Sequence, residues 1–246
     1  KQMTIDQYEA EFLCSFESAI MGAFYGDQVT KLGREGRICD VTYDDAVPVH
    51  TAWDLGYSDD TAIWWYQVIR GEIHVLDFYA VSGATIKELA DVVLSKPYKY
   101  GKHYLPHDAR AKTLASGGKS IIEQMAEFFG INNLSIVPEL SVQDGIQAVR
   151  RMLPRCWFDA ERTQDGLEAL RQYQREYDED KKAFRQTPRH DWTSHPADAF
   201  RMMAIAWKQE PVIRAPDREK PLMVGPQNTV TLNDMWATVK PKGARI

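Results

Sequence analysis

Cysteine is scarce in this sequence, and the chain has neither a long apolar run nor an excess of positive charge. Its three cysteines, Cys14, Cys39 and Cys156, are scattered, without the paired spacing of a disulfide framework or a zinc site. We therefore expect them to be core residues of a protein from a reducing compartment. No apolar run approaches the roughly 20 residues needed to span a bilayer.

The excess of acidic residues limits how the chain could bind nucleic acid. Its 246 residues contain 30 Lys and Arg against 35 Asp and Glu, for a net charge of −5. This argues against a protein that holds nucleic acid mainly by a broad basic surface. It does not exclude an enzyme that touches DNA transiently, because a cluster of active-site carboxylates itself lowers the net charge. The length allows one large domain or two small ones with a sizeable core.

The first half of the sequence predicts a lead-in followed by a sheet. Within residues 1–47, Gln7–Phe24 carries an apolar stripe typical of a helix, and glycines between residues 33 and 38 imply turns. After Pro48, the runs 49–54, 61–69 and 73–81 are rich in aromatic and branched residues and are joined by short turns, which predicts an antiparallel meander. On the third strand we expect the buried face to carry Ile73, Val75 and Phe78.

Helices and strands alternate in the second half. We expect strands at residues 103–107, 134–137 and 156–158, the last at an edge, and helices at 86–93, 120–129, 142–153, 163–173 and 196–207. Together these elements predict an α/β fold, a mixed sheet of the antiparallel meander plus parallel strands, flanked by helices. Residues 177–189 are predicted as either a protruding hairpin or a disordered loop. Past Glu210 no period is sustained, which is typical of a tail that is flexible or docked onto a partner.

The stretch Ser116-Gly117-Gly118-Lys119-Ser120 resembles a phosphate-binding loop only superficially. The full pattern needs glycine at position 113, where this chain has Thr113. We therefore interpret the stretch as a turn into a capped helix.

Three aspartates stand at the edges of predicted elements. Asp54 ends the first strand, Asp108 follows the fourth strand, which should lie beside the first, and Asp198 lies three residues after His195 in the first turn of the last helix. An aspartate at a strand end is often only a turn former, Asp198 could complement the helix dipole, and His195 could cap the helix. Spacing alone leaves these alternatives open. The other histidines of interest are expected at the surface rather than as ligands: His103, His107 and His190.

Carboxylates that converge from separate elements would suit hard divalent cations. Magnesium prefers oxygen ligands and takes few of them from a protein. Three carboxylates and a histidine could hold two such ions about 4 Å apart, an arrangement used in phosphodiester hydrolysis.

At these residues the chain resembles the C-terminal nuclease domain of the large subunit of tailed-bacteriophage terminases. The resemblance rests on Asp54-Leu55-Gly56 with its continuation Asp60-Thr61-Ala62, on Asp108, and most specifically on His195-x-x-Asp198-Ala199-x-Arg201. It covers residues 48–208 and implies a ribonuclease H-like fold, related to Holliday-junction resolvases and retroviral integrases.

The resemblance also implies a domain organisation and partners. Residues 1–47 would be a linker from an ATPase domain that this chain lacks, which agrees with a start at Lys1. Residues 48–208 would form the nuclease domain, and residues 209–246 would form a C-terminal tail. The implied activity is cleavage of concatemeric viral double-stranded DNA during genome packaging, with little sequence specificity. The implied partners are the portal protein and the terminase small subunit, and the implied location is the host cytoplasm.

The same resemblance implies two Mg²⁺ or Mn²⁺ ions. Asp54 would bind both ions, Asp108 would bind one of them, and Asp198 would bind the other. His195 would complete the shell of one ion or position a water molecule. Arg110, Lys112 and Lys119 are candidates for holding the DNA backbone, although a solvated helix entrance explains them as well. Asp59 and Asp60 are candidates for the outer shell.

Two other functions remain open from the sequence. A junction resolvase or integrase-like nuclease shares the fold and would prefer four-way junctions. A non-catalytic portal-docking module would not bind manganese.

Overall fold

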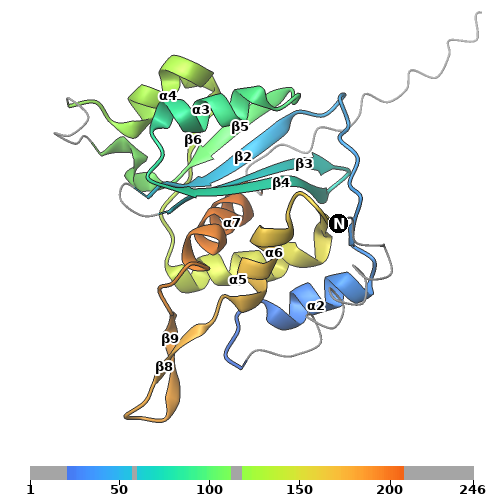
Figure 1. Cartoon of the computed structure of the whole chain (residues 1–246), viewed down its shortest axis with the longest axis vertical. Coiled ribbons are helices and arrows are strands. Elements are labelled where there is room, and N and C mark those ends of the chain that lie inside the picture. Colours follow the sequence, from blue (N-terminus) through green and yellow to red (C-terminus); the bar gives the residue numbers. More distant parts are fainter. Residues whose placement is uncertain (1–20, 57–59, 112–117, 208–246) are drawn as a thin grey trace, which may run out of the picture. The chain divides into compact units, whose positions relative to one another are not determined.

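The computed structural model describes residues 21–56, 60–111 and 118–207. In these residues the central element is a mixed seven-stranded sheet with the strand order β1-β7-β4-β3-β2-β5-β6 (Figure 1). Strands β2, β3 and β4 form an antiparallel meander, and the remaining pairs are parallel. The predicted mixed sheet is thus confirmed. The strands are β1 (Ile38–Cys39), β2 (Val49–Asp54), β3 (Asp60–Ile69), β4 (Glu72–Ser82), β5 (Tyr100–Leu105), β6 (Leu134–Ile136) and β7 (Cys156–Asp159).

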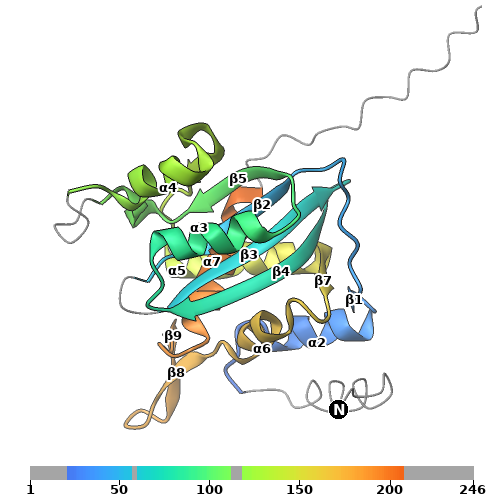
Figure 2. The same cartoon turned by 45° about the horizontal axis from the view of Figure 1, so that its top comes forward.

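Helices cover both faces of the sheet, as Figures 1 and 2 show. Helices α3 and α4 pack on one face, and α2, α5, α6 and α7 pack on the other. The helices are α2 (Gly26–Arg34), α3 (Ile86–Ser95), α4 (Ile121–Phe129), α5 (Val142–Met152), α6 (Gln164–Gln172) and α7 (Ser194–Ala206), with single 3-10 turns η1 (His107–Arg110), η3 (Ile131–Asn133) and η4 (Leu153–Arg155). In the described part of the chain, none of the helices is long and apolar enough to cross a membrane.

Strand β3 is apolar throughout because both of its faces are buried. Successive side chains of a strand point to opposite faces, so Trp64 and Tyr66 join the core under α5 and α7, while Ile63 and Trp65 join the core under α3 and α4. All four are fully buried. The position of β3 at the centre of the sheet therefore explains its continuous aromatic and branched run.

A bulge in β4 explains why Ile73, Val75 and Phe78, which were predicted to lie on one face of the sheet, do so. Ile73 and Val75 are fully buried and Phe78 is half-buried against the same core. Odd and even positions share a face because the register shifts between the pairs Trp65–Asp77 and Tyr66–Val75.

Short polar motifs start the helices where the sequence predicts. Thr85 with Glu88, and Ser120 with Glu123, form capping boxes at α3 and α4. Gly130, at φ 77°, ends α4. The described end of the glycine-rich stretch, residues 118–120, is a turn into a capped helix, as predicted.

One prediction about the sheet is wrong, and so is the predicted end of the N-terminal helix. Strand β7 is not an edge strand, because β1 pairs with it through Ile38 and Phe158. Residues 21–24, predicted as the end of the helix Gln7–Phe24, form turns and a single bridge from Ala23 to Gln174, and α2 follows them as a helix that was not predicted. Residues 7–20 lie outside the described part of the chain, as do Cys14 and the predicted tail.

Of the two predictions for residues 177–189, the hairpin is confirmed. Strands β8 (Arg175–Asp178) and β9 (Ala183–Pro188) pair antiparallel, with the rings of Tyr177 and Phe184 5.1 Å apart. The two described cysteines are free, with Cys156 buried and Cys39 half-buried.

Candidate active site

Three acidic residues lie at one edge of the sheet because of its strand directions. Asp54 is the last residue of β2 and pairs with Ala62, so that Asp60, at the start of the antiparallel β3, lies at the same edge. Strand β5 runs parallel to β2 with Ala52 beside Tyr104. Continuing that register places Asp54 level with Pro106, shortly before Asp108 in η1.

The start of helix α7 is fixed by hydrogen bonds from two directions. The Asp191 carboxylate accepts from the backbone N–H of Thr193 at 3.0 Å and from its hydroxyl at 2.6 Å. The indole of Trp64, from β3, donates to the carbonyl oxygen of Pro196 at 2.9 Å. Proline is tolerated here because the first helical turn does not use its missing N–H. These contacts set the position of the turn that carries His195 and Asp198.

His195 contacts Asp54 directly. The distance from His195 Nδ1 to Asp54 Oδ2 is 2.9 Å, and the two side chains are 16% and 21% exposed. A carboxylate can only accept, so Nδ1 carries the proton. The hydrogen bond with Asp54 raises the pKa of His195 against the opposing effect of burial, and the charges of Asp198 and Asp60 raise it further. His195 is therefore biased toward its charged form by a cluster of carboxylates.

Asp198 lies in the same cluster and is neutralised by Arg201. Both Nε and Nη2 of Arg201 donate to Asp198 Oδ1, at 3.0 and 2.8 Å. Burial raises the pKa of Asp198, Arg201 opposes this, and the nearby charge of Asp54 adds to the rise. Because Arg201 uses only Oδ1, it leaves the second oxygen of Asp198 available for another ligand.

Asp108 is exposed and more loosely connected. Among the described residues, no hydrogen bond or ion pair links Asp108 to Asp54 or Asp198. Within the same part of the chain, no three His, Cys, Asp or Glu side chains converge as a metal cluster. The structure thus brings Asp54, His195 and Asp198 together, with Asp60 near them, and places Asp108 at the same edge of the sheet.

The remaining candidate residues are at the surface or undescribed. Arg110 is exposed, and Lys119 forms an exposed ion pair with Glu127 at 2.5 Å. Lys112 and Asp59 lie outside the described residues.

The prediction that His103 lies at the surface is wrong, whereas His107 and His190 are exposed as predicted. His103 is 1% exposed, and its Nδ1 lies 2.7 Å from the Thr51 hydroxyl, which accepts from the Trp53 indole at 2.6 Å. The indole N–H can only donate, so the Thr51 hydroxyl accepts from Trp53 and joins the indole to the imidazole of His103. The parallel pairing of β5 with β2, which joins residues far apart in sequence, buries this histidine.

A cavity of about 370 Å³ lies next to the carboxylate cluster. Asp60 and Pro196 belong to its lining, together with Asp165 of α6 and the half-exposed Trp192. The lining thus combines aromatic surface with two carboxylates, so its negative charge repels a phosphate group.

A mixed sheet with these directions, flanked by helices and carrying an aspartate at the end of a central strand, defines the chain as a ribonuclease H-like protein. The family model described as the terminase RNaseH-like domain matches residues 51–205, and the chain belongs to this family. No curated protein matches the sequence significantly.

Three solved structures illustrate the similarity. The large terminase of the thermophilic bacteriophage D6E has a TM-score of 0.56 and 14% identity, covering 82% of this chain and 52% of its own. The P22 large terminase nuclease domain has a TM-score of 0.52 and 19% identity, covering 71% and 89%. The nuclease domain of the bacteriophage SPP1 large terminase g2p, with bound Mn, has a TM-score of 0.50 and 17% identity, covering 70% and 96%. At these identities the likeness concerns the fold, and this chain spans about half the length of the D6E protein.

Proposed function

We propose that this chain is a metal-dependent endonuclease that cleaves concatemeric viral double-stranded DNA, with little sequence specificity, during genome packaging. The observation that carries the proposal is the meeting of Asp54, at the end of β2, with His195 and Asp198 of α7 in a chain of the terminase RNaseH-like family. The bound Mn in the SPP1 nuclease domain supports the dependence on a divalent ion.

The donor set fits magnesium or manganese. Carboxylate oxygens, which three aspartates of the site supply, suit both ions. In the proposed assignment Asp54 would be the ligand shared by two ions, Asp108 would hold one of them, and Asp198 would hold the other through the oxygen that Arg201 leaves. His195 would complete a shell or orient water, and Asp59 and Asp60 would act from the outer shell. When bound, such ions lower the pKa of a water molecule and stabilise the leaving oxygen, giving a 3′-hydroxyl and a 5′-phosphate.

The protein's own charges prepare the site for this role. Arg201 offsets the charge of Asp198 and the His195 proton offsets that of Asp54, so the carboxylates can be packed together. The site otherwise repels the DNA backbone. Arg110, Lys112 and Lys119 are the proposed backbone contacts, and Lys119 would have to exchange Glu127 for a phosphate. With so few cations, we expect weak DNA binding without base readout, and a shallow dependence on salt because few phosphates are neutralised.

The wider setting is part of the proposal. Because the chain spans about half of the D6E large terminase, we propose that it acts with a packaging ATPase domain of the same polypeptide. The portal protein and the terminase small subunit would be its partners in the host cytoplasm.

Replacing Asp54 tests the proposal. With Mn²⁺ and supercoiled plasmid, Asp54→Ala should lower the cleavage rate at least 100-fold, because a ligand shared by both ions is removed, while the melting temperature changes little. Asp91→Ala removes an exposed aspartate of α3 that pairs with Lys87, and should cleave like the wild type. A folded and fully active Asp54→Ala protein would disprove the assignment. A preference for four-way junctions over linear duplex would instead indicate a resolvase.

A further inference from the structure

Trp192 presents a large aromatic surface beside the candidate active site. It is 51% exposed and lies shortly before the start of α7. Its side chain belongs to the lining of the cavity of about 370 Å³, together with Asp60 and Pro196. Pro196 lies between His195 and Asp198 in the chain, so the cavity adjoins the residues proposed to hold the metal ions. A part of the DNA next to the cleaved bond therefore comes within reach of this ring.

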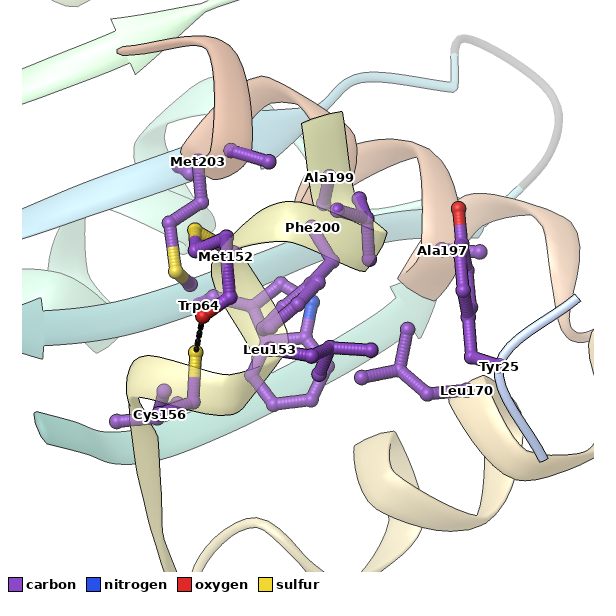
Figure 3. Packing of buried hydrophobic residues seen from close by; sticks show 14 of the residues in the cluster. Tyr25, Trp64, Met152, Leu153, Cys156, Leu170, Ala197, Ala199, Phe200 and Met203 are labelled. Atoms are coloured by element: carbon purple, nitrogen blue, oxygen red, sulfur yellow. Dashed lines mark hydrogen bonds between the residues drawn. The ribbon is translucent and has the colours of Figure 1, made fainter. Parts of the chain in front are cut away.

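Hydrogen bonds on either side of Trp192 hold it in a defined position. The backbone N–H of Asp191 donates to the Ser194 hydroxyl at 3.0 Å, and the backbone N–H of Ser194 donates to the Asp191 carbonyl at 2.9 Å. Helix α7, which follows, is anchored by Phe200, a fully buried residue whose ring centroid lies 5.1 Å from that of Trp64 (Figure 3). A fixed turn therefore carries the indole, as a preorganised binding surface requires.

The lining of the cavity repels a phosphate group but suits a nucleobase. Its two carboxylates, Asp60 and Asp165, form no ion pair with another described residue and are available as acceptors. A base offers a π-face to an indole, and the amino groups of adenine, cytosine and guanine can donate to carboxylates. Because every base has a π-face, such stacking tolerates any sequence and agrees with cleavage of little sequence specificity.

An organic cation would also match aromatic surface and carboxylates. The position of the cavity favours the base, because the neighbouring metal site would bring the DNA to it. We propose that Trp192 is a substrate-binding residue that stacks on one nucleobase beside the cleaved phosphodiester bond, with the edge of the base toward Asp60 and Asp165. The inference deepens the proposed function and rests on it, since it takes DNA as the substrate.

The inference specifies the kind of duplex that the site prefers. A base must leave the duplex stack to enter the cavity, and this costs least where the base is mismatched or already unpaired. The bond beside such a base should therefore be cut faster than the same bond in a perfectly paired duplex.

Paired changes in the protein and in the DNA test the inference. The whole chain cleaves end-labelled duplexes with Mn²⁺, each duplex carries one abasic site, and the cleavage at every bond is read on a sequencing gel. With the wild type, one bond at a fixed offset from the abasic site should be cut about tenfold less than in intact DNA, within the range that loss of one base–aromatic stack costs. Trp192→Ala should cut intact DNA about tenfold more slowly and show no further reduction at that bond. Trp192→Phe, which keeps a ring, should recover most of the wild-type rate.

A matched control removes an equally exposed apolar side chain elsewhere. Leu94→Ala changes a residue that is 53% exposed on α3, which packs on the opposite face of the sheet from α7, and it should reproduce the wild-type pattern. The inference is overturned if no bond is spared in the wild type, or if Trp192→Ala spares the same bond to the same extent. Calorimetric binding of spermidine that Trp192→Ala abolishes, without a spared bond, would instead assign the cavity to an organic cation.

The outcomes separate this inference from the proposed function. If the wild type cuts no DNA with Mn²⁺, the proposed function fails, and binding without metal decides the inference. The fluorescence of Trp192, taken as the difference between the wild type and Trp192→Phe, should then be quenched by a mismatched duplex and not by the same duplex lacking the mismatched base. Equal quenching by the two duplexes, or none by either, would overturn the inference.

Discussion

Replacing Gly166 by alanine tests how the sheet places helix α7. A Cβ atom at this position of α6 would lie 2.3 Å from Cη2 of Trp64 and 2.7 Å from Cγ of Phe78. Trp64 holds the first turn of α7 through Pro196. The added methyl group must therefore displace either α6 or the indole that fixes the turn carrying His195.

The expected destabilisation follows from two opposing effects. Overpacking a well-packed core costs about 1–3 kcal/mol, and contact with a fully buried ring at this distance belongs at the upper end. Replacing a helical glycine by alanine returns up to about 1 kcal/mol. The net loss is about 2 kcal/mol, which lowers the melting temperature of a domain of this size by about 4–8 °C.

Two other helical glycines give a matched series. At Gly33 of α2 the nearest atom to the added Cβ is Cδ1 of Ile38 at 3.8 Å, an ordinary contact, so Gly33→Ala should be neutral or slightly stabilising. At Gly145 of α5 the nearest atom is Cδ of Arg201 at 3.1 Å, so Gly145→Ala should displace Arg201 by a few tenths of an ångström. We expect an intermediate stability for this variant and weaker Mn²⁺ binding.

Thermal unfolding followed by circular dichroism, together with Mn²⁺-dependent plasmid cleavage, measures the series. Gly166→Ala should melt lowest and also cleave more slowly, because it moves the turn that carries His195. A Gly166→Ala protein as stable and as active as Gly33→Ala would refute the inferred packing of α6, Trp64 and α7.

Two further predictions concern the buried histidines. Thr51→Val leaves the Trp53 indole and His103 without their shared hydrogen-bond partner. In urea titrations it should lower the free energy of unfolding by about 2 kcal/mol. The control Thr61→Val loses only a 3.4 Å contact with the carbonyl of Gly56 and should be nearly neutral. Burial lowers the pKa of His50 and of His103 to about 4, below the value near 6.5 in the unfolded chain. The stabilisation from their neutral forms is therefore complete above about pH 6.5 and is lost as the pH falls toward 4. The His50→Gln/His103→Gln variant should show a shallower loss over that range; an unchanged slope would contradict the assignment.

The features that could be predicted from the sequence are local ones. The β2–β4 meander follows from aromatic and branched runs separated by short turns, and the starts of α3 and α4 follow from capping boxes. The motif from His195 to Arg201 is also local, since its residues lie within two turns of one helix.

The features that could not be predicted depend on distant partners. Helix α2 has few apolar residues and two glycines, so contacts with the core rather than its own pattern stabilise it. Strand β1 has only two residues and shows no alternation. The burial of His103 depends on pairing across 52 positions. The domain boundaries and the roles of the site residues remain predictions.

A crystal of the whole chain soaked in manganese tests the central claim most directly. We expect anomalous density for two ions about 4 Å apart, with Asp54 between them, Asp108 on one and Asp198 on the other. The Asp54 carboxylate should then have left the His195 contact seen at 2.9 Å, or share it with a metal. Manganese bound elsewhere, with Asp54 still paired only to His195, would contradict the account.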